Sequence, residues 1–416
     1  MNIPKKPIKA GKIMTNAEIA ITSACRTPFG RFLGALKEID YFDLGALPMQ
    51  EVLKRVNLEG NVVDEVFWGV GDTSVCKDVF TPVAARQTLL KAGLPPETPS
   101  ISLDKACVSA MSAVKLATMA IGLGEIDTAI AGGATAFSRV PLIVRGSRYN
   151  GFRVGDQVME DPCFMLRYRD FTPVSVDADN VAFECGITRR EMDEWALRSH
   201  YNYGKAWEAG KFKDEMISME IPQPKGESIN LNIDEQYRAD ASMEKLSKLK
   251  PMFGTKAITP GNAPGLNDGA TAILLMTRKK ANQLGVEVLG TISTMVSIAL
   301  KPDRMAEAPA VAIKKLLNTA SLSLEDIHVM EINEAFAAVP LVSIEMLSNG
   351  DKTKAKEIQQ KTNINGSAIA TGHPNTATGA RIMMNLLYEL RRRGGGYAIG
   401  ALCGGLAQAD ACLIKV

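Results

Sequence analysis

Residues 102–121 read SLDKACVSAMSAVKLATMAI, and this stretch decides the fold. A short apolar strand pattern runs into Cys107, small residues follow, and apolar residues then recur at helical spacing with little charge between them. The pattern predicts a strand, a turn and a buried helix, with Cys107 at the helix N-terminus. Unpaired backbone N–H groups and the positive end of the helix dipole favour a thiolate there. A lone cysteine in an apolar segment is also typical of inert packing, so a reactive Cys107 needs partners from elsewhere in the chain.

Composition excludes several classes of function. The chain has 416 residues, enough for two or three domains, and its net charge of +2 favours neither nucleic acid nor a membrane surface as a partner. Its seven cysteines and three histidines are scattered, so we expect no metal site and a reduced, cytoplasmic protein. Residues 1–15 are basic and lack the apolar region of a signal peptide, and we find no run of about 18 apolar residues that would predict a membrane-spanning helix.

Strand and helix patterns alternate along the first third of the chain. The predicted elements are strands at 19–24, 63–69 and 127–133 and helices at 44–56 and 81–92. The alternation predicts a layered α/β fold whose sheets are covered on both faces. Gly132 and Gly133 close the last of these strands, where we expect a turn.

The sequence changes character between residues 139 and 257, which are more polar and less regular. We interpret this region as an inserted loop domain over the core. Within it, Thr188 and Glu191 form a capping-box pattern that opens a predicted helix ending at Ala209. The remaining boundaries are an N-terminal extension at 1–15, a first half at 16–138 plus 258–285, and a second half at 286–416.

The last third of the chain repeats the order of the first. The segment 324–331 is similar to 63–69, and about 45 residues later each copy has a strand-to-helix junction, with Cys107 in one and His373 in the other. Each copy then has a strand and a Gly-Gly pair, which in the second copy is Gly404-Gly405. Two similar halves packed back to back would bring both helix N-termini to one shared site.

Three further motifs supply the partners that Cys107 needs. Gly372-His373-Pro374 opens a second buried helix, so its imidazole is a candidate partner for the thiol. Cys403 is followed by two glycines, which allow a backbone N–H to approach a substrate oxygen. Asn333 begins an Asn-Glu-Ala-Phe motif after a strand, and its amide can hold a water or a substrate oxygen. Taken singly, His373 is also typical of a structural histidine, Cys403 of a packing cysteine and Asn333 of a turn residue.

A separate basic segment contains Lys245, Lys248 and Lys250. These lysines are typical of a solvated face, although they could also meet a phosphate.

Together these motifs resemble one family, the thiolases, over nearly the whole chain. The resemblance rests on Cys107 before its small-residue helix, Gly261-Asn-Ala-Pro-Gly-Leu-Asn-Asp-Gly-Ala, Asn333-Glu-Ala-Phe, Gly372-His-Pro and Cys403-Gly-Gly, in this order. It implies the thiolase fold: two similar α/β halves in αβαβα layers plus the inserted loop domain.

The resemblance also implies a reaction, the thiolytic cleavage of a 3-oxoacyl-CoA or the reverse Claisen condensation. Cys107, activated by His373, would carry the acyl group, and Cys403 would protonate the departing carbanion. A water held by Asn333, together with His373, would stabilise the enolate, and the N–H groups of Cys107 and Gly405 would form a second oxyanion hole. Coenzyme A would be a co-substrate, with no permanently bound cofactor and no metal.

By the same resemblance, residues 139–257 would cover the CoA. Arg238 would pack on its adenine, Pro264 would lie near its pantetheine arm, and Lys245 is a further candidate contact.

Departures from the family pattern concern the acyl group. Pro264 replaces a common serine, Pro173-Val-Ser175 replaces a His-Met-Gly, and Asn375-Thr376 replaces Ile-Gly. They suggest a bulky, branched, dicarboxylic or aromatic acyl group, as in a benzoylsuccinyl-CoA thiolase of anaerobic aromatic degradation, rather than acetoacetyl-CoA.

Two other functions stay open from the sequence: a condensing enzyme of the ketoacyl-synthase or hydroxymethylglutaryl-CoA synthase type, and a catalytically idle thiolase-fold subunit that binds acyl-CoA. Expected partners are acyl-CoA, CoA and further copies of the chain in a homodimer or homotetramer. Some members of the family also work with a small zinc-containing partner protein.

Overall fold

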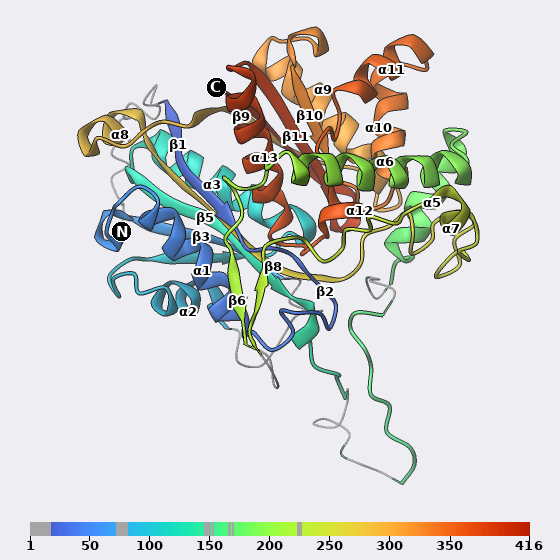
Figure 1. The fold of residues 1–416 in the computed structure, drawn as a ribbon, viewed down its shortest axis with the longest axis horizontal. Helices are drawn as coiled ribbons and strands as arrows, with labels where there is room; N and C mark the ends of the chain where they lie inside the picture. The colour runs from blue at the N-terminus through green and yellow to red at the C-terminus, as the bar shows by residue number, and fades with distance from the viewer. Residues whose placement is uncertain are drawn as a thin grey trace, which may run out of the picture.

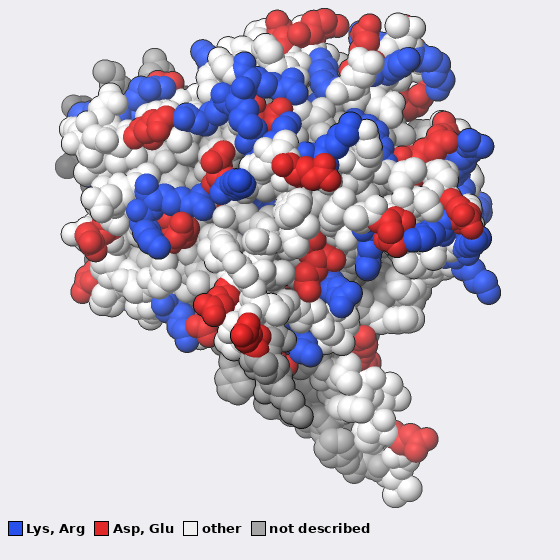
Figure 2. All heavy atoms as spheres, viewed as in Figure 1, with Lys and Arg blue, Asp and Glu red and all other residues white. Residues whose placement is uncertain are grey.

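A computed structural model describes residues 18–71, 82–144, 151, 154–164, 168, 170–222 and 227–416. The predicted N-terminal extension, 1–15, lies outside these residues. Helices and strands alternate as expected, and Figure 1 shows the two halves of the chain side by side. Basic and acidic side chains are interspersed over the face in Figure 2, in keeping with the small net charge.

Two sets of strands build the sheets. The first half contributes β1 (Ile19–Arg26), β2 (Gly30–Arg31), β3 (Glu65–Val70), β4 (Ser100–Leu103), β5 (Thr128–Ala136) and β8 (Asn267–Thr277). The second half contributes β9 (Gly290–Ala299), β10 (Val329–Ile332), β11 (Tyr397–Gly404) and β12 (Gln408–Lys415). The spatial order is β4-β3-β5-β8-β1-β9-β12-β11-β10, with β2 paired to the start of β8. Only two residue pairs, Ala20–Thr291 and Ile21–Gly290, join β1 to β9 and so connect the halves.

The two halves repeat one topology. In the first, β1 pairs with β8 and β8 with β5 antiparallel, whereas β5 pairs with β3 and β3 with β4 parallel. In the second, β9 pairs with β12 and β12 with β11 antiparallel, and β11 pairs with β10 parallel. A parallel bridge between Met330 and Thr362 stands where β4 stands in the first half. The predicted internal repeat is therefore present.

The helices form three layers around these sheets. In the first half, α1 (Tyr41–Lys54) and α2 (Ala84–Lys91) cover the outer face; in the second, α9 (Ala308–Ala320) contacts β9, β11 and β12 and packs on α10 (Ala338–Ser348). Between the sheets lie α3 (Ser109–Leu123) and α13 (Thr378–Arg393), each of which contacts strands of both halves. This is the predicted αβαβα order. The shorter helices are α8 (Arg278–Leu284), α11 (Lys352–Gln360) and α12 (Ala368–Thr371).

Helix α3 is apolar enough to resemble a membrane span. By length and composition alone Ala106–Leu123 could cross a membrane, although Lys115 interrupts its apolar residues. Most of this window is buried, because both sheets cover the helix, and such a core helix is weak evidence for a membrane.

The glycine pair at 132–133 corrects another expectation. Both residues lie inside β5, paired with Ala272 and Thr271 of β8, and form no turn. A Cβ on Gly132 would lie 2.0 Å from the carbonyl oxygen of Thr271, and one on Gly133 would lie 2.1 Å from that of Thr376. The glycines therefore serve close backbone packing and not chain reversal.

The polar region between β5 and β8 is an insertion at a defined point. The equivalent link in the second half, between β11 and β12, is the three-residue turn Gly405–Ala407, whereas the first half has residues 137–266 there. The insertion contains α5 (Val174–Glu184), α6 (Arg189–Glu208), a hairpin of β6 (Met219–Ile221) and β7 (Ile229–Leu231), and α7 (Met243–Ser247). Helix α6 opens with the predicted capping box of Thr188 and Glu191. The described residues before α5 extend away from the body of the molecule (Figure 1).

A buried ion-pair cluster fastens the insertion to the core. Arg26 of β1 is fully buried; its Nε lies 2.7 Å from Glu215, and its two Nη atoms lie 2.7 and 3.0 Å from the carboxylate of Asp234. The Tyr203 hydroxyl of α6 donates to Asp234 at 2.9 Å. Glu215 and Asp234 belong to the insertion, so its path over the core is fixed.

Candidate active site

Cys107 lies in a tight turn between β4 and α3, as the sequence predicts. A single 3₁₀ turn, Ala106–Val108, precedes the helix, and Ala106 has a left-handed φ of 50°. The Asp104 carboxylate accepts a hydrogen bond from the Ala106 N–H at 2.9 Å. The Ser109 hydroxyl accepts one from the Lys105 N–H at 2.8 Å and donates to the Ala106 carbonyl at 2.6 Å. Side chains on both sides therefore shape the turn that carries the half-buried Cys107.

His373 lies in the loop between α12 and α13. Its backbone N–H donates to Asn267 at 2.8 Å, and its Nδ1 lies 2.8 Å from the hydroxyl of Thr378, the first residue of α13. That hydroxyl donates to the Pro374 carbonyl at 3.1 Å, so it accepts from Nδ1–H, and Nε2 is left with a free lone pair. Nε2 is buried and has no hydrogen-bond partner.

Burial sets the charge of this imidazole. Loss of solvation, with a further contribution from the positive charge of Arg381, lowers the pKa of His373 to about 3. The ring is therefore neutral near pH 7, and its Nε2 can accept a proton.

Cys403 ends β11 opposite Ala409 of β12 and is almost fully buried. Burial raises the pKa of its thiol to about 12, so this cysteine keeps its proton near neutral pH. A Cβ on Gly404 would lie 3.1 Å from the Lys105 carbonyl oxygen, and one on Gly405 would lie 3.2 Å from the Ala106 Cβ. The turn after Cys403 thus packs directly on the turn that carries Cys107.

One pocket of about 480 Å³ receives most of the predicted site residues. Cys107, His373, Cys403 and Gly405 line it, although they come from two ends of the chain. The two candidate CoA contacts Pro264 and Arg238 line the same pocket.

Two predicted residues lie outside the pocket lining. Asn333 is fully buried behind it, and neither its Oδ1 nor its Nδ2 has a hydrogen-bond partner, so its amide is available to a bound group. Lys245 is an exposed side chain that pairs with Asp240.

Comparison with known proteins identifies this arrangement. Residues 19–279 match the family described as "Thiolase, N-terminal domain", and residues 286–416 match "Thiolase, C-terminal domain". The chain belongs to the thiolase family. It is therefore a CoA-dependent acyltransferase that cleaves an acyl-CoA by thiolysis or forms one by condensation, with CoA as co-substrate and no permanent cofactor.

Full-length relatives support the assignment. An acetyl-CoA acetyltransferase of Chromobacterium violaceum is 39% identical over 400 residues, which cover 94% of this chain and 98% of the relative. The crystal structure of the Bacillus anthracis acetyl-CoA acetyltransferase matches with a TM-score of 0.88 at 35% identity, covering 97% of this chain and all of that one. Human mitochondrial 3-ketoacyl-CoA thiolase in complex with CoA matches with the same TM-score at 32% identity, covering 96% of this chain and 98% of that one.

The thiolase pocket also contains residues whose place the sequence did not reveal. Tyr168 and Cys163 reach it from the insertion, and a Cβ on Gly405 would lie only 2.0 Å from the Tyr168 hydroxyl. No local pattern marks them, because their position depends on how the insertion folds over the core. Ser175 and Asn375 line the pocket too, and for these a signal existed, since both depart from the family pattern.

Behind the pocket, Glu334 of the Asn-Glu-Ala-Phe motif organises the thiolase site. Its buried carboxylate accepts hydrogen bonds from Trp195 at 2.8 Å, Ser199 at 2.7 Å, Asn363 at 2.9 Å and the Ile369 N–H at 3.1 Å. Glu334 therefore connects α6 of the insertion with α12, the helix that precedes the His373 loop, and holds both close to Asn333.

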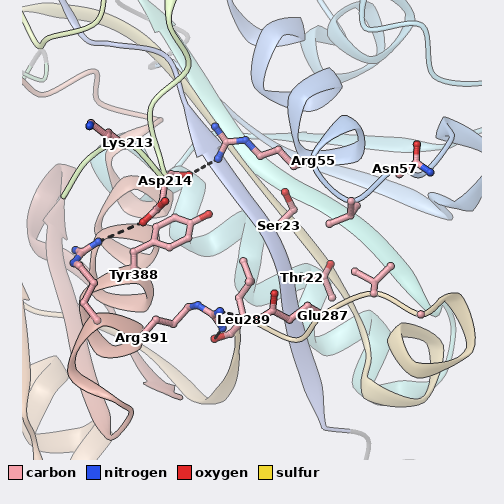
Figure 3. A pocket seen from close by; sticks show the side chains of 14 residues that line it. Thr22, Ser23, Arg55, Asn57, Lys213, Asp214, Glu287, Leu289, Tyr388 and Arg391 are labelled. Carbon is pink, nitrogen blue, oxygen red and sulfur yellow. Dashed lines mark hydrogen bonds and ion pairs between the residues drawn. The ribbon is translucent and has the colours of Figure 1, made fainter. Parts of the chain in front are cut away.

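A wider cleft of about 840 Å³ lies elsewhere and contains none of the predicted site residues (Figure 3). Three of its arginines already have partners: Arg55 donates to the backbone carbonyl of Asp214, Arg392 lies 3.8 Å from the Asp214 carboxylate, and Arg391 lies 2.6 Å from Glu287. These contacts link the insertion and the β8–β9 connection to the two halves, so we assign the cleft no chemistry.

Proposed function

We propose that this thiolase cleaves a 3-oxoacyl-CoA in two acyl-transfer steps through an acyl group on Cys107. The observation that carries the proposal is the single pocket lined by Cys107, His373, Cys403 and Gly405. Cys403 and His373 differ in protonation as the two roles require: a buried thiol that keeps its proton, and a neutral imidazole with an open Nε2.

In the cleavage direction, Nε2 of His373 takes the proton of Cys107, whose sulfur attacks the 3-keto carbon. The bond between Cα and Cβ breaks, the acyl group stays on Cys107, and the thiol of Cys403 donates its proton to the departing carbanion. The Cys403 thiolate then takes the proton of a second CoA thiol, whose sulfur attacks the acyl group; Cys107 leaves and regains its proton from His373. In reverse, Cys403 removes the α-proton before condensation.

Two groups of donors stabilise the developing negative charges. The backbone N–H groups of Cys107 and Gly405 form one oxyanion hole, and His373 with a water held by Asn333 forms the other. The unpartnered amide of Asn333 supports this role, because a buried amide without a protein partner needs another group, such as a water, to satisfy its hydrogen bonds. Each hole donor contributes about 3 kcal/mol to lowering the barrier.

The preferred acyl group is bulky and polar, such as a dicarboxylic or aromatic 3-oxoacyl chain of the benzoylsuccinyl type. Ser175, only 2% exposed, is among the residues that line the pocket, and its buried hydroxyl has no hydrogen-bond partner. Asn375, next but one to His373, adds an amide to the same lining, whereas Val174, Met305 and Phe336 supply apolar walls. A buried polar group without a partner favours a substrate that can bind it.

The insertion covers the CoA in this proposal, with domain boundaries at 139 and 257. Arg238 packs on the adenine and Pro264 lies along the pantetheine arm. Lys245 would meet a phosphate only by leaving Asp240.

We further propose a cytoplasmic homodimer or homotetramer that works in β-oxidation or in aromatic degradation, where a small zinc-containing partner is a candidate subunit. Exposed apolar side chains on the extended part of the insertion support self-association: Leu142, Val154, Val158 and Met159.

A substrate panel tests the proposal. Short linear, long linear, dicarboxylic and arylacyl 3-oxoacyl-CoA substrates are offered with CoA to the wild type, Cys107→Ala and Cys403→Ala. We expect both variants to lose turnover, a trappable acyl-enzyme in Cys403→Ala alone, and the highest kcat/KM with a dicarboxylic or arylacyl substrate. CoA binding without turnover by the wild type would instead indicate an idle subunit, and full activity of Cys403→Ala would refute its role as proton donor.

A further inference from the structure

Both turns that meet at the pocket contain non-glycine residues in a left-handed conformation. Ala106, directly before Cys107, has a φ of 50°, and Leu406 and Ala407, directly after Gly405, have φ values of 55° and 58°. L-residues adopt this region at a cost, so neighbouring contacts must hold the backbone there.

A buried carboxylate lies beside both turns. Asp410 of β12 is fully buried among Ala409, Ala411 and Cys412, where packing alone calls for an apolar side chain. Its Oδ1 lies 2.6 Å from the Nζ of Lys105, and its Oδ2 accepts a hydrogen bond from the Ser112 hydroxyl of α3.

The positions of these three residues define what they join. Lys105 directly precedes the left-handed Ala106, and Asp410 follows the left-handed Ala407 by three residues. The Lys105 carbonyl also faces Gly404, where a Cβ would approach it to 3.1 Å. One side-chain cluster therefore connects the first half, which supplies Cys107, to the second half, which supplies Cys403.

Two further positive charges lie near Asp410 in the described part of the chain. Lys115 of α3 donates to the Ser297 hydroxyl at 2.8 Å, and Lys315 of α9 donates to the Ser297 carbonyl at 3.0 Å. Ser297 stands opposite Asp410 on β9. Burial lowers the pKa of Lys115, and Lys105 and Lys315 lower it further while Asp410 opposes them. The carboxylate thus offsets part of the positive charge of Lys105, Lys115 and Lys315.

We propose that Lys105, Ser112 and Asp410 are positioning residues that hold the Cys107 and Cys403 turns in register for the reaction. The inference rests on the proposed function, because it takes Cys107 as the nucleophile. The cluster touches no substrate in this proposal: it fixes two strained turns, and its charges contribute to the electrostatic field at the Cys107 thiol.

The test compares Asp410→Asn, Lys105→Met and Ser112→Ala with a matched control. Glu389→Gln removes another buried carboxylate, which lies near the end of α13 away from the pocket lining and pairs with the half-buried Lys211. For each variant we would measure folded fraction, kcat, KM for CoA, and the pH midpoint of Cys107 alkylation by iodoacetamide, read by peptide mass spectrometry.

We expect kcat to fall about 10-fold or more in Asp410→Asn and Lys105→Met, and less in Ser112→Ala, with KM for CoA changed less than about twofold. The alkylation midpoint should move in opposite directions: down in Asp410→Asn, where the ammonium groups lose their counter-charge, and up in Lys105→Met. Glu389→Gln should keep both the wild-type kcat per folded molecule and the wild-type midpoint.

The inference is overturned if Asp410→Asn and Lys105→Met, corrected for folded fraction, behave like Glu389→Gln. If Asp410→Asn does not fold, the same comparison with Lys105→Met and Ser112→Ala decides. Cys107→Ala distinguishes failure of the proposed function from failure of this inference. Turnover retained in Cys107→Ala would refute the proposed function. Turnover lost in Cys107→Ala but normal in the cluster variants would refute only this inference.

Discussion

His373 and Cys403 show how local surroundings divide one chemical task between two residues. Burial keeps the imidazole neutral and the Cys403 thiol protonated, whereas Cys107 is half-buried at a helix N-terminus. The hydrogen bond from Nδ1 to Thr378 fixes the imidazole tautomer. A base and an acid can therefore act in one pocket near pH 7 without sharing a titration range.

Ser175 allows a prediction about substrate choice. Ser175→Ala should lower kcat/KM about 10-fold for a dicarboxylic 3-oxoacyl-CoA and less than about twofold for a linear one, since a hydrogen bond to a charged group is worth about 1.5–3 kcal/mol. Steady-state kinetics with both substrates measure the ratio.

Ser343→Ala is the matched control, because that serine is also buried with an unpartnered hydroxyl but lies in α10, outside the pocket lining. Equal losses for both substrates in Ser175→Ala would refute selection by the Ser175 hydroxyl.

At the scale of elements, the close crossing of α3 and α13 brings the two active-site loops together. A Cβ on Gly379 of α13 would lie 2.6 Å from the backbone nitrogen of Met111 in α3, so the helices touch backbone to backbone there. Cys107 and His373 each lie a few residues before these helices. The crossing therefore sets the separation of the two loops.

Gly379→Ala should therefore destabilise the protein by about 1–3 kcal/mol, because neither backbone can yield without moving a helix. Gly122→Ala in α3 is the control: its Cβ would meet only Ile19, at 3.9 Å, and replacing glycine by alanine in a helix gains about 1 kcal/mol. Denaturant unfolding measures both changes. If Gly122→Ala destabilised the protein as much as Gly379→Ala, the close contact between α3 and α13 could not be the cause of the destabilisation in Gly379→Ala.

The same elements show what a sequence pattern conveys. The α6 boundaries were predictable, because the capping box of Thr188 and Glu191 is a local signal. Helix α1 begins at Tyr41, where Asp40 caps it, three residues before the predicted start. The role of Gly132 could not be predicted, since the carbonyl of Thr271 that excludes its side chain comes from a strand 130 residues away.

For the whole molecule, two buried histidines predict how stability depends on pH. Burial, with the charge of Arg381, lowers the pKa of His373 to about 3, and burial, with that of Arg238, lowers the pKa of His200 to about 4. The unfolded chain binds protons near pH 6.5 and the folded one does not. The two neutral histidines therefore contribute their full stabilisation above pH 6.5. This contribution is lost as the pH falls toward about 4 for His200 and about 3 for His373.

The free energy of unfolding should fall by up to about 1.4 kcal/mol per pH unit for each histidine in this window. Urea unfolding at several pH values between 4 and 7 measures the slope, and His373→Asn should make it shallower. Identical slopes in the wild type and His373→Asn would contradict a neutral, buried imidazole.

The sequence revealed the architecture more fully than the pocket. The five thiolase motifs are short and local, so Cys107, His373, Cys403 and Gly405 could be placed from their neighbours alone. The pocket wall could not, because Tyr168 and Cys163 belong to the insertion, whose path depends on contacts such as Arg26 with Glu215 and Asp234. Lys245 illustrates the limit, since a basic side chain near the insertion's end is paired with Asp240 and not directed into the pocket.

The repeated topology has a consequence for the origin of such a chain. Each half supplies one of the two helix-opening loops, the first with the thiol and the second with the imidazole, and only a two-residue ladder between β1 and β9 joins their sheets. A polypeptide of one half would have to pair with a copy of itself to build a comparable pocket, with the same residue on both loops. Fusion into one chain permits each loop to specialise separately, and it lets a single copy gain the long insertion while the other keeps a three-residue turn.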